Sequence, residues 1–122
     1  IFAIAGDAGF MMNVHEMETA KRLNSDITVI IWEDNSYGLI KWKQENQFGE
    51  TSDLDFDNPN WDELSKSFGW NYFEESQSKN LKKTLKEIYK RKGPNLLLIP
   101  IDYSENYKLT QKLSKLRLPK KK

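Results

Sequence analysis

Two acidic residues lie in short turns at the ends of apolar segments, with a spacing that could bring them side by side. Asp7 follows the apolar segment 1–5, and Asp34 follows the β-branched segment 27–32. The residues between them have room for one helix and one strand, which make a single βαβ unit. If the two strands are neighbours, both carboxylates project from the same edge of a parallel sheet.

This edge would offer two carboxylates to a hard cation and backbone N–H groups to an anion. Gly6 and Gly9 leave the backbone around Asp7 free to approach a ligand closely, and the N–H groups after Gly9 open a helix. Mg²⁺ bound to a diphosphate suits both, because Mg²⁺ is usually held by one or two carboxylates and by phosphate oxygens. The alternative is structural: Asp7 caps a helix, and Asp34 belongs to a turn closed by its own side-chain hydrogen bonds.

Strands and helices that could position these turns alternate along the chain. The acidic segment 49–60 lacks periodicity and is expected to be a loop, and we expect Asn60 to cap the helix that follows it and Gly69 to end that helix. The alternation predicts an α/β fold, an open and mainly parallel sheet with helices on both faces, in which ligands bind at the carboxyl ends of strands. Strands are expected at 1–5, 27–32, 70–75 and 95–101, and helices at 11–23, 39–46, 61–69 and 78–93.

The 122 residues suffice for one domain, expected at 1–107, followed by a basic tail at 108–122. The chain opens inside an apolar run, which indicates a piece of a larger multidomain protein. Cysteine is absent and no segment resembles a signal peptide or a membrane span, so we expect a cytoplasmic protein without membrane contact. The tail holds seven of the 19 basic residues and no acid, but it has no tryptophan, tyrosine or phenylalanine for base stacking, so we interpret it as a solvated tail rather than a nucleic-acid site.

The two turns together resemble the cofactor motif of thiamine diphosphate enzymes, which begins with G-D-G and ends about 25 to 30 residues later near N-N. Here its ends are Gly6-Asp7-Ala8 and the segment EDNSYG at 33–38. The wider stretch 6–44, and PIDYS at 100–104, are similar to the diphosphate-binding domain of acetolactate synthases. Ala8 departs from the second glycine, but a G-D-A form occurs in the acetohydroxyacid synthase branch.

The resemblance implies a role for each residue of the two turns. It implies that Mg²⁺ is bound by the carboxylates of Asp7 and Asp34 and by the carbonyl of Ser36. The diphosphate would be held by backbone N–H groups of Ala8 and Gly9, beside Gly6. The cofactor would then extend toward its reactive ring past four consecutive residues: Tyr37, Gly38, Leu39 and Ile40.

The resemblance also implies an activity, that of an acetolactate synthase-like carboligase. Such an enzyme decarboxylates pyruvate on thiamine diphosphate and joins the two-carbon unit to a second 2-oxo acid, in branched-chain amino acid or acetoin synthesis. The glutamate that activates the cofactor would come from a partner domain in a homo-oligomer, so the chain by itself is expected to be inactive. Two alternatives stay open: a 2-oxo acid decarboxylase of the same superfamily, and a non-catalytic α/β binding module.

Four further kinds of residue call for an interpretation. Lys43 lies one helical turn after Leu39, so it either contacts the carboxylate of a 2-oxo acid or lies in solvent. His15 stands alone on an expected helix and is interpreted as structural rather than as a base. The remaining residues are expected to pack in the core or in interfaces: Met11, Met12, Trp32, Trp42, Trp61 and Trp70.

Overall fold

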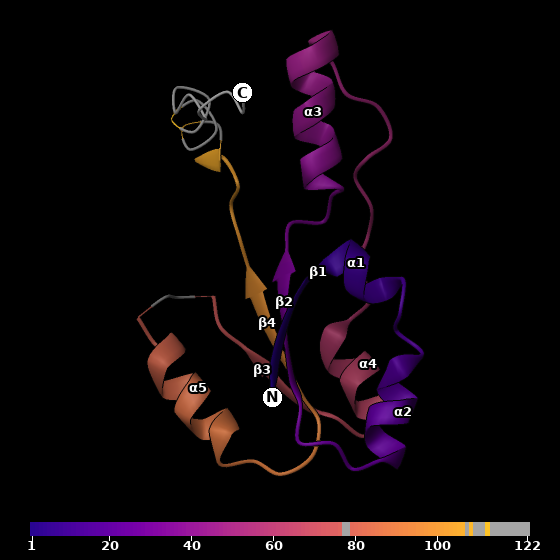
Figure 1. Ribbon diagram of the computed structural model, residues 1–122, viewed down its shortest axis with the longest axis vertical. Helices are drawn as coiled ribbons and strands as arrows, with labels where there is room; N and C mark the ends of the chain where they lie inside the picture. Colours follow the sequence, from indigo (N-terminus) through magenta and orange to yellow (C-terminus); the bar gives the residue numbers. More distant parts are fainter. Residues whose placement is uncertain (77–78, 107, 109–111, 113–122) are drawn as a thin grey trace, which may run out of the picture.

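A computed structural model describes residues 1–76, 79–106, 108 and 112 of the chain. Strands and helices alternate through most of this part, as the sequence predicts (Figure 1). The expected basic tail at 108–122 lies outside the described residues apart from Lys108 and Lys112. The elements are β1 (Phe2–Gly6), α1 (Asp7–Met11), α2 (Glu16–Arg22), β2 (Thr28–Glu33), α3 (Gly38–Phe48), α4 (Trp61–Ser67), β3 (Asn71–Glu74), α5 (Leu81–Tyr89) and β4 (Asn95–Pro100).

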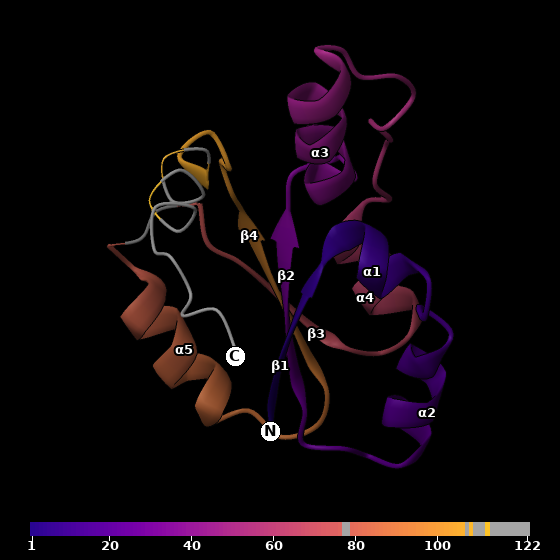
Figure 2. The ribbon, with the colours of Figure 1, turned by 45° about the horizontal axis from the view of Figure 1, so that its top comes forward.

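The strands form one parallel sheet with the order β1-β2-β4-β3. β1 and β2 are therefore neighbours, and Gly6 pairs with Trp32 at their carboxyl ends. Figures 1 and 2 show α3 standing beyond these ends, away from the body of the sheet. The register thus brings the turns after β1 and β2 to one edge, beneath the start of α3.

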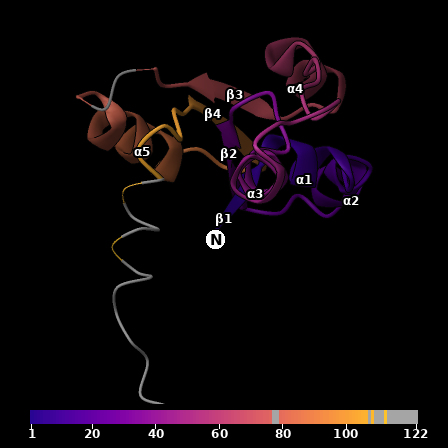
Figure 3. The same cartoon turned by 90° about the horizontal axis from the view of Figure 1, so that it is seen from above.

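Helices cover both faces of the sheet, which confirms the predicted α/β class. On one face α1, α2 and α4 pack over the strands (Figure 3). Leu97 of β4 points to the other face because side chains alternate along a strand, and it is fully buried there on the side of α5 with Ile88. The core of the first face consists of Met17, Val29, Ile31, Trp61, Trp70, Leu96 and Leu98.

β1 is buried on only one of its two sides. Phe2 is 49% exposed and Ile4 is 61% exposed, whereas Ala3 packs against the core. The strand lies at the edge of the described sheet, and α5 lies over the opposite end of that face, near β3 and β4. One side of β1 is therefore left open, and Trp32 beside it is also 41% exposed.

The single helix expected at 11–23 is instead two helices. α1 begins directly at Asp7, and residues 12–15 form turns before α2 begins at Glu16. In these turns Asn13 N–H donates to the Phe10 carbonyl at 2.9 Å, which is the tighter i→i+3 spacing of a 3₁₀ turn. The chain changes direction there, so that Phe10 of α1 and Met17 of α2 both reach the core.

The ends of the other helices follow local signals. Asn60 Oδ1 accepts a hydrogen bond from Glu63 N–H at 3.1 Å, which confirms the cap of α4, and Gly69 has a left-handed φ of 70° just after it. α3 runs from Gly38 to Phe48, slightly longer than expected. α5 ends at Tyr89, earlier than the expected 93. Within the described part of the chain, no helix has the length and apolar character needed to cross a lipid bilayer.

The acidic segment 49–60 is a loop, as predicted, but it is attached to the second turn. Tyr37 N–H donates to the Leu54 carbonyl at 2.9 Å, and Phe56 N–H donates to the Asn35 carbonyl at 3.0 Å. Between these bonds Ser36 and Asp55 form an antiparallel bridge. The loop therefore returns from α3 to hold the backbone of the turn after β2.

Candidate functional site

The carboxylate of Asp7 is almost completely buried, with 2% exposure, at the junction of β1 and α1. Its Oδ2 accepts hydrogen bonds from the N–H groups of Asp34 at 3.3 Å and Asn35 at 2.9 Å, and from the side-chain amide of Asn58 at 2.8 Å. Its Oδ1 accepts one from Ala8 N–H at 2.8 Å. Asp7 therefore joins the two turns directly. A hydrogen-bonded turn at 33–38 is compatible with Asp7 as a metal ligand.

The carboxylate of Asp34 lies beside that of Asp7 and against the first residue of α3. A Cβ at Gly38 would collide with Asp34 Oδ2, so a larger residue there would require the end of the acidic side chain to shift. Burial raises the pKa of Asp34, and the negative charge of Asp7 raises it further. The two acids therefore share a partly desolvated place in which a bound cation would relieve their repulsion.

A cavity of about 540 Å³ opens over these two acids. Its floor consists of the turns after β1 and β2, and its wall is the first turn and a half of α3 together with the segment after β4. A second cavity of about 720 Å³ lies against Asp34, α3 and residues 101–104. Nine of the residues that the sequence proposes for the site line the first cavity: Gly6, Asp7, Ala8, Asp34, Ser36, Tyr37, Gly38, Leu39 and Ile40.

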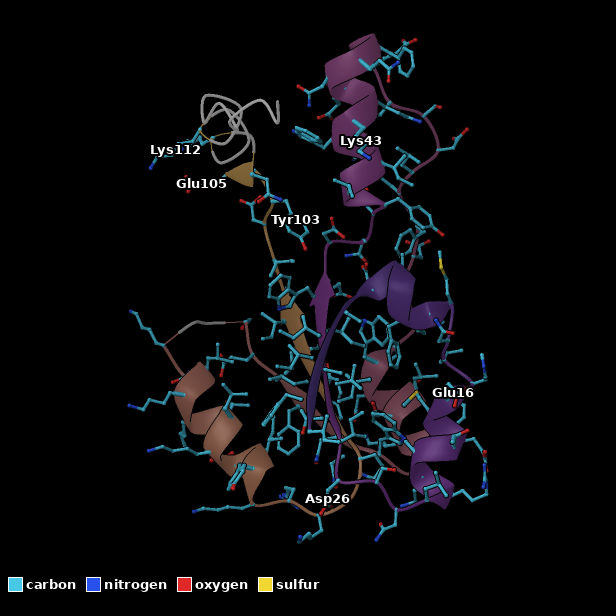
Figure 4. The ribbon with its side chains drawn as sticks, viewed as in Figure 1. Glu16, Asp26, Lys43, Tyr103, Glu105 and Lys112 are labelled. Atoms are coloured by element: carbon cyan, nitrogen blue, oxygen red, sulfur yellow. The ribbon has the colours of Figure 1, made fainter. Side chains whose placement is uncertain are left out.

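Gly9 and Lys43 lie outside the residues that line these two cavities. Gly9 is exposed inside α1, which begins at Asp7, four residues earlier than the expected helix. Lys43 is exposed on α3 (Figure 4), and its contact with a substrate stays a prediction. His15 is exposed, with Nε2 3.5 Å from Glu16 Oε1, so it is a surface residue rather than a core residue.

Only some of the tryptophans and methionines pack in the core. Trp61 and Trp70 are buried in the core, as predicted. Trp42 lines both cavities, and its indole nitrogen is buried without a hydrogen-bond partner among the described residues. Met11 packs against the core, whereas Met12 is 67% exposed and lines a small third cavity beside α1.

Sequence reasoning missed two residues that the structure brings to this edge. Tyr103 lines both cavities, and its ring carbon Cδ2 lies 3.8 Å from the position of a Cβ on Gly38 (Figure 4). Burial raises the pKa of Tyr103, and the charges of Asp34 and Asp7 raise it further. The PIDYS motif contains Tyr103 and could have pointed to it, but nothing in the sequence around Asn58 indicates its contact with Asp7.

The donor set at this edge fits a magnesium diphosphate better than a metal held by protein alone. No group of three or more histidine or acidic side chains within the described residues is arranged to hold a metal ion. Two carboxylates and nearby backbone carbonyls would leave several positions for phosphate oxygens and water, as Mg²⁺ prefers. The cavity that these groups line supplies space for the anion beside them.

Comparison with known proteins identifies the family. The chain matches the model of the C-terminal TPP binding domain of thiamine pyrophosphate enzymes over residues 1–99. It is 31% identical to an acetolactate synthase of Bacillus subtilis over 109 residues, 89% of this chain and 19% of that protein. It is 30% identical to a catabolic acetolactate synthase of Raoultella terrigena over 106 residues, 87% of this chain and 19% of that protein.

These matches describe a domain rather than a whole enzyme. The chain spans about a fifth of the length of these two curated relatives. The match runs from β1 into β4, so it includes both turns that meet at Asp7 and Asp34. The chain therefore belongs to the thiamine pyrophosphate enzyme family, in which it corresponds to the C-terminal TPP binding domain.

Proposed function

We propose that the edge formed by the turns after β1 and β2 binds the Mg²⁺ and diphosphate of thiamine diphosphate. The carboxylates of Asp7 and Asp34 and the carbonyl of Ser36 would be the protein ligands of the metal. The observation that carries this proposal is the meeting of two carboxylates beneath one cavity, with Asp34 N–H donating to Asp7 at 3.3 Å. Because Oδ2 of Asp7 already accepts three hydrogen bonds, Oδ1 is the oxygen with capacity for a metal.

The rest of the cofactor would lie along the cavity. The backbone around Gly6, Ala8 and Gly9 would face the diphosphate, although the N–H of Ala8 must exchange its bond to Asp7 Oδ1 for one to phosphate. Tyr37, Gly38, Leu39 and Ile40 would contact the part nearer the reactive ring. In support, Leu39 is 68% exposed and Ile40 is 49% exposed, so both apolar side chains are free for such a contact.

The reaction proposed for the whole protein is that of an acetolactate synthase-like carboligase. When bound, thiamine diphosphate supplies an electron sink for the decarboxylation of a 2-oxo acid such as pyruvate. The residues of this chain would hold and orient the cofactor, and the apolar wall of α3 would exclude water, so that a second 2-oxo acid rather than a proton is the acceptor. The two similar proteins named acetolactate synthase support this choice.

Other parts of a longer protein are needed for this reaction. In this proposal the full-length protein is a homo-oligomer in the cytoplasm. A glutamate of a partner domain activates the cofactor. Within that protein, residues 1–107 would be the cofactor domain and 108–122 its basic tail. Product analysis of the full-length protein separates the carboligase from the alternative: acetolactate from pyruvate supports it, and free acetaldehyde indicates a decarboxylase. Absence of cofactor binding indicates the third possibility, a binding module.

Titration of the full-length protein with thiamine diphosphate and Mg²⁺, followed by calorimetry, tests the site. Asp34→Ala removes one carboxylate, and Asp62→Ala is the matched control, since Asp62 pairs with Lys66 on α4. A hydrogen bond to a charged group contributes about 1.5–3 kcal/mol, so Asp34→Ala is expected to lower the affinity for Mg²⁺ about ten- to a hundredfold. Equal Mg²⁺ affinity of Asp34→Ala and Asp62→Ala would overturn the proposed site.

A further inference from the structure

Besides Asp7 itself, the side chain of Asn58 connects the two turns of the candidate site. It lies in the loop between α3 and α4, far in sequence from Asp7. Its Nδ2 lies 2.8 Å from Asp7 Oδ2, 2.9 Å from Asn35 Oδ1 and 3.2 Å from Glu33 Oε1. The three neighbours are all acceptors, so the amide must present its nitrogen to them.

A second donor fixes this arrangement from the hydrophobic core. Glu33 Oε1 also accepts a hydrogen bond from the indole nitrogen of Trp61 at 2.6 Å. Trp61 is 4% exposed, begins α4 and packs against Phe10 with 5.9 Å between ring centroids. A continuous chain of hydrogen bonds therefore runs from the core tryptophan through Glu33 and Asn58 to Asp7.

The bonds to Oδ2 determine how Asp7 presents its other oxygen. The donors from Asp34 and Asn35 belong to one turn, and Asn58 adds a donor from another segment of the chain. Donors from two segments fix the rotation of the carboxylate about its Cβ–Cγ bond more firmly than one. Asn35 itself has a left-handed φ of 54°, and Asn58 holds its side chain. Without Asn58, both the carboxylate and the turn would gain freedom.

We propose that Asn58 is a positioning residue for the metal-binding carboxylate of Asp7, held by Glu33 and Trp61. This inference rests on the proposed function, because it presumes that Asp7 binds Mg²⁺. Residues that hydrogen-bond a metal ligand typically change metal affinity 10- to 100-fold when they are replaced. Asn58→Ala is therefore expected to raise the dissociation constant of Mg²⁺ about tenfold or more.

The experiment measures Mg²⁺ binding to the full-length protein at saturating thiamine diphosphate, by calorimetry and by tryptophan fluorescence. Asn60→Ala is the matched control: it removes the cap of α4 in the same segment, but Asn60 bonds Glu63 rather than Asp7. We expect Asn60→Ala to lower the melting temperature and to change Mg²⁺ affinity less than twofold. If Asn58→Ala proves too unstable, Asn58→Leu keeps the side-chain volume and removes the same donor.

The outcomes separate this inference from the proposal beneath it. A tenfold loss in Asn58→Ala, with near wild-type affinity in Asn60→Ala, supports a positioning role, since loss of stability alone would affect both. Equal Mg²⁺ affinity in Asn58→Ala and wild type, while Asp34→Ala loses binding, overturns the role of Asn58 and keeps the metal site. No loss in Asp34→Ala overturns both.

Discussion

The carboxylate of Asp34 lies so close to the α-carbon of Gly38 that a Cβ there would collide with Asp34 Oδ2. Gly38 is the first residue of α3, and Tyr103 closes the same space from the segment after β4. The glycine therefore has a role beyond backbone freedom: it lets the helix begin directly over an acidic side chain. A residue larger than glycine would require Asp34 Oδ2 to leave this position beside α3.

Gly38→Ala is expected to displace Asp34 and to weaken Mg²⁺-dependent binding of thiamine diphosphate about tenfold or more. A double-mutant cycle with Asp34→Ala isolates the collision. Gly38→Ala should lower the melting temperature of the otherwise unchanged protein. In the Asp34→Ala background the clash is absent, and alanine is favoured over glycine in a helix by up to about 1 kcal/mol, so Gly38→Ala should not lower the melting temperature there. An equal loss of stability in both backgrounds would contradict this explanation.

Asp26 gives a pH-dependent contribution to stability at the opposite end of the sheet (Figure 4). A hydrogen bond from Gly93 N–H, and then one from Lys92, holds the pKa of Asp26 below its ordinary 3.8. A lowered pKa in the folded state means that this contribution is full above 3.8 and is lost as the pH falls further. Asp26→Asn should therefore lower the melting temperature at neutral pH, and the difference should shrink as acid protonates Asp26. A constant difference down to strongly acidic pH would contradict the prediction.

Lys43 tests how far the site extends along α3. A contact with a substrate carboxylate predicts that Lys43→Met lowers kcat/KM for 2-oxo acids about ten- to a hundredfold, with unchanged cofactor affinity. A surface lysine predicts a change of less than about twofold. Because Lys43 is exposed and lies outside both cavities of the site, we expect the second result. Lys82→Met on α5 is the control for removal of an exposed charge.

The open side of β1 predicts the behaviour of the 122-residue chain produced by itself. Its core should allow it to fold, but the exposed Phe2, Ile4 and Trp32 should cause self-association, visible by light scattering. Ile4→Lys should reduce the association, whereas Leu23→Lys, at an exposed position after α2, should not. This chain should release no carbon dioxide from pyruvate. A monomeric chain without the Ile4→Lys substitution would contradict the expected self-association. Activity near that of an intact enzyme would contradict the expected inactivity.

Much of the fold could be predicted because its signals are local. The β-branched run at 27–32, the cap at Asn60 and the glycine at 69 specify a strand, a helix start and a helix end through the backbone of neighbouring residues. The break between α1 and α2 could not be predicted in this way. It depends on Phe10 and Met17 both reaching the core, which is a property of the packed sheet.

The candidate site divides along the same line. By itself the sequence determined that Asp7 and Asp34 follow strands, that small residues surround them, and that the two turns match a cofactor motif. Only the tertiary structure decided that β1 and β2 are neighbours, that Asp34 lies against Gly38, and that Asn58 reaches Asp7 from a loop 51 residues away. Local backbone preference can specify a turn, but hydrogen bonds between distant segments form only when the packing of the whole sheet brings those segments together.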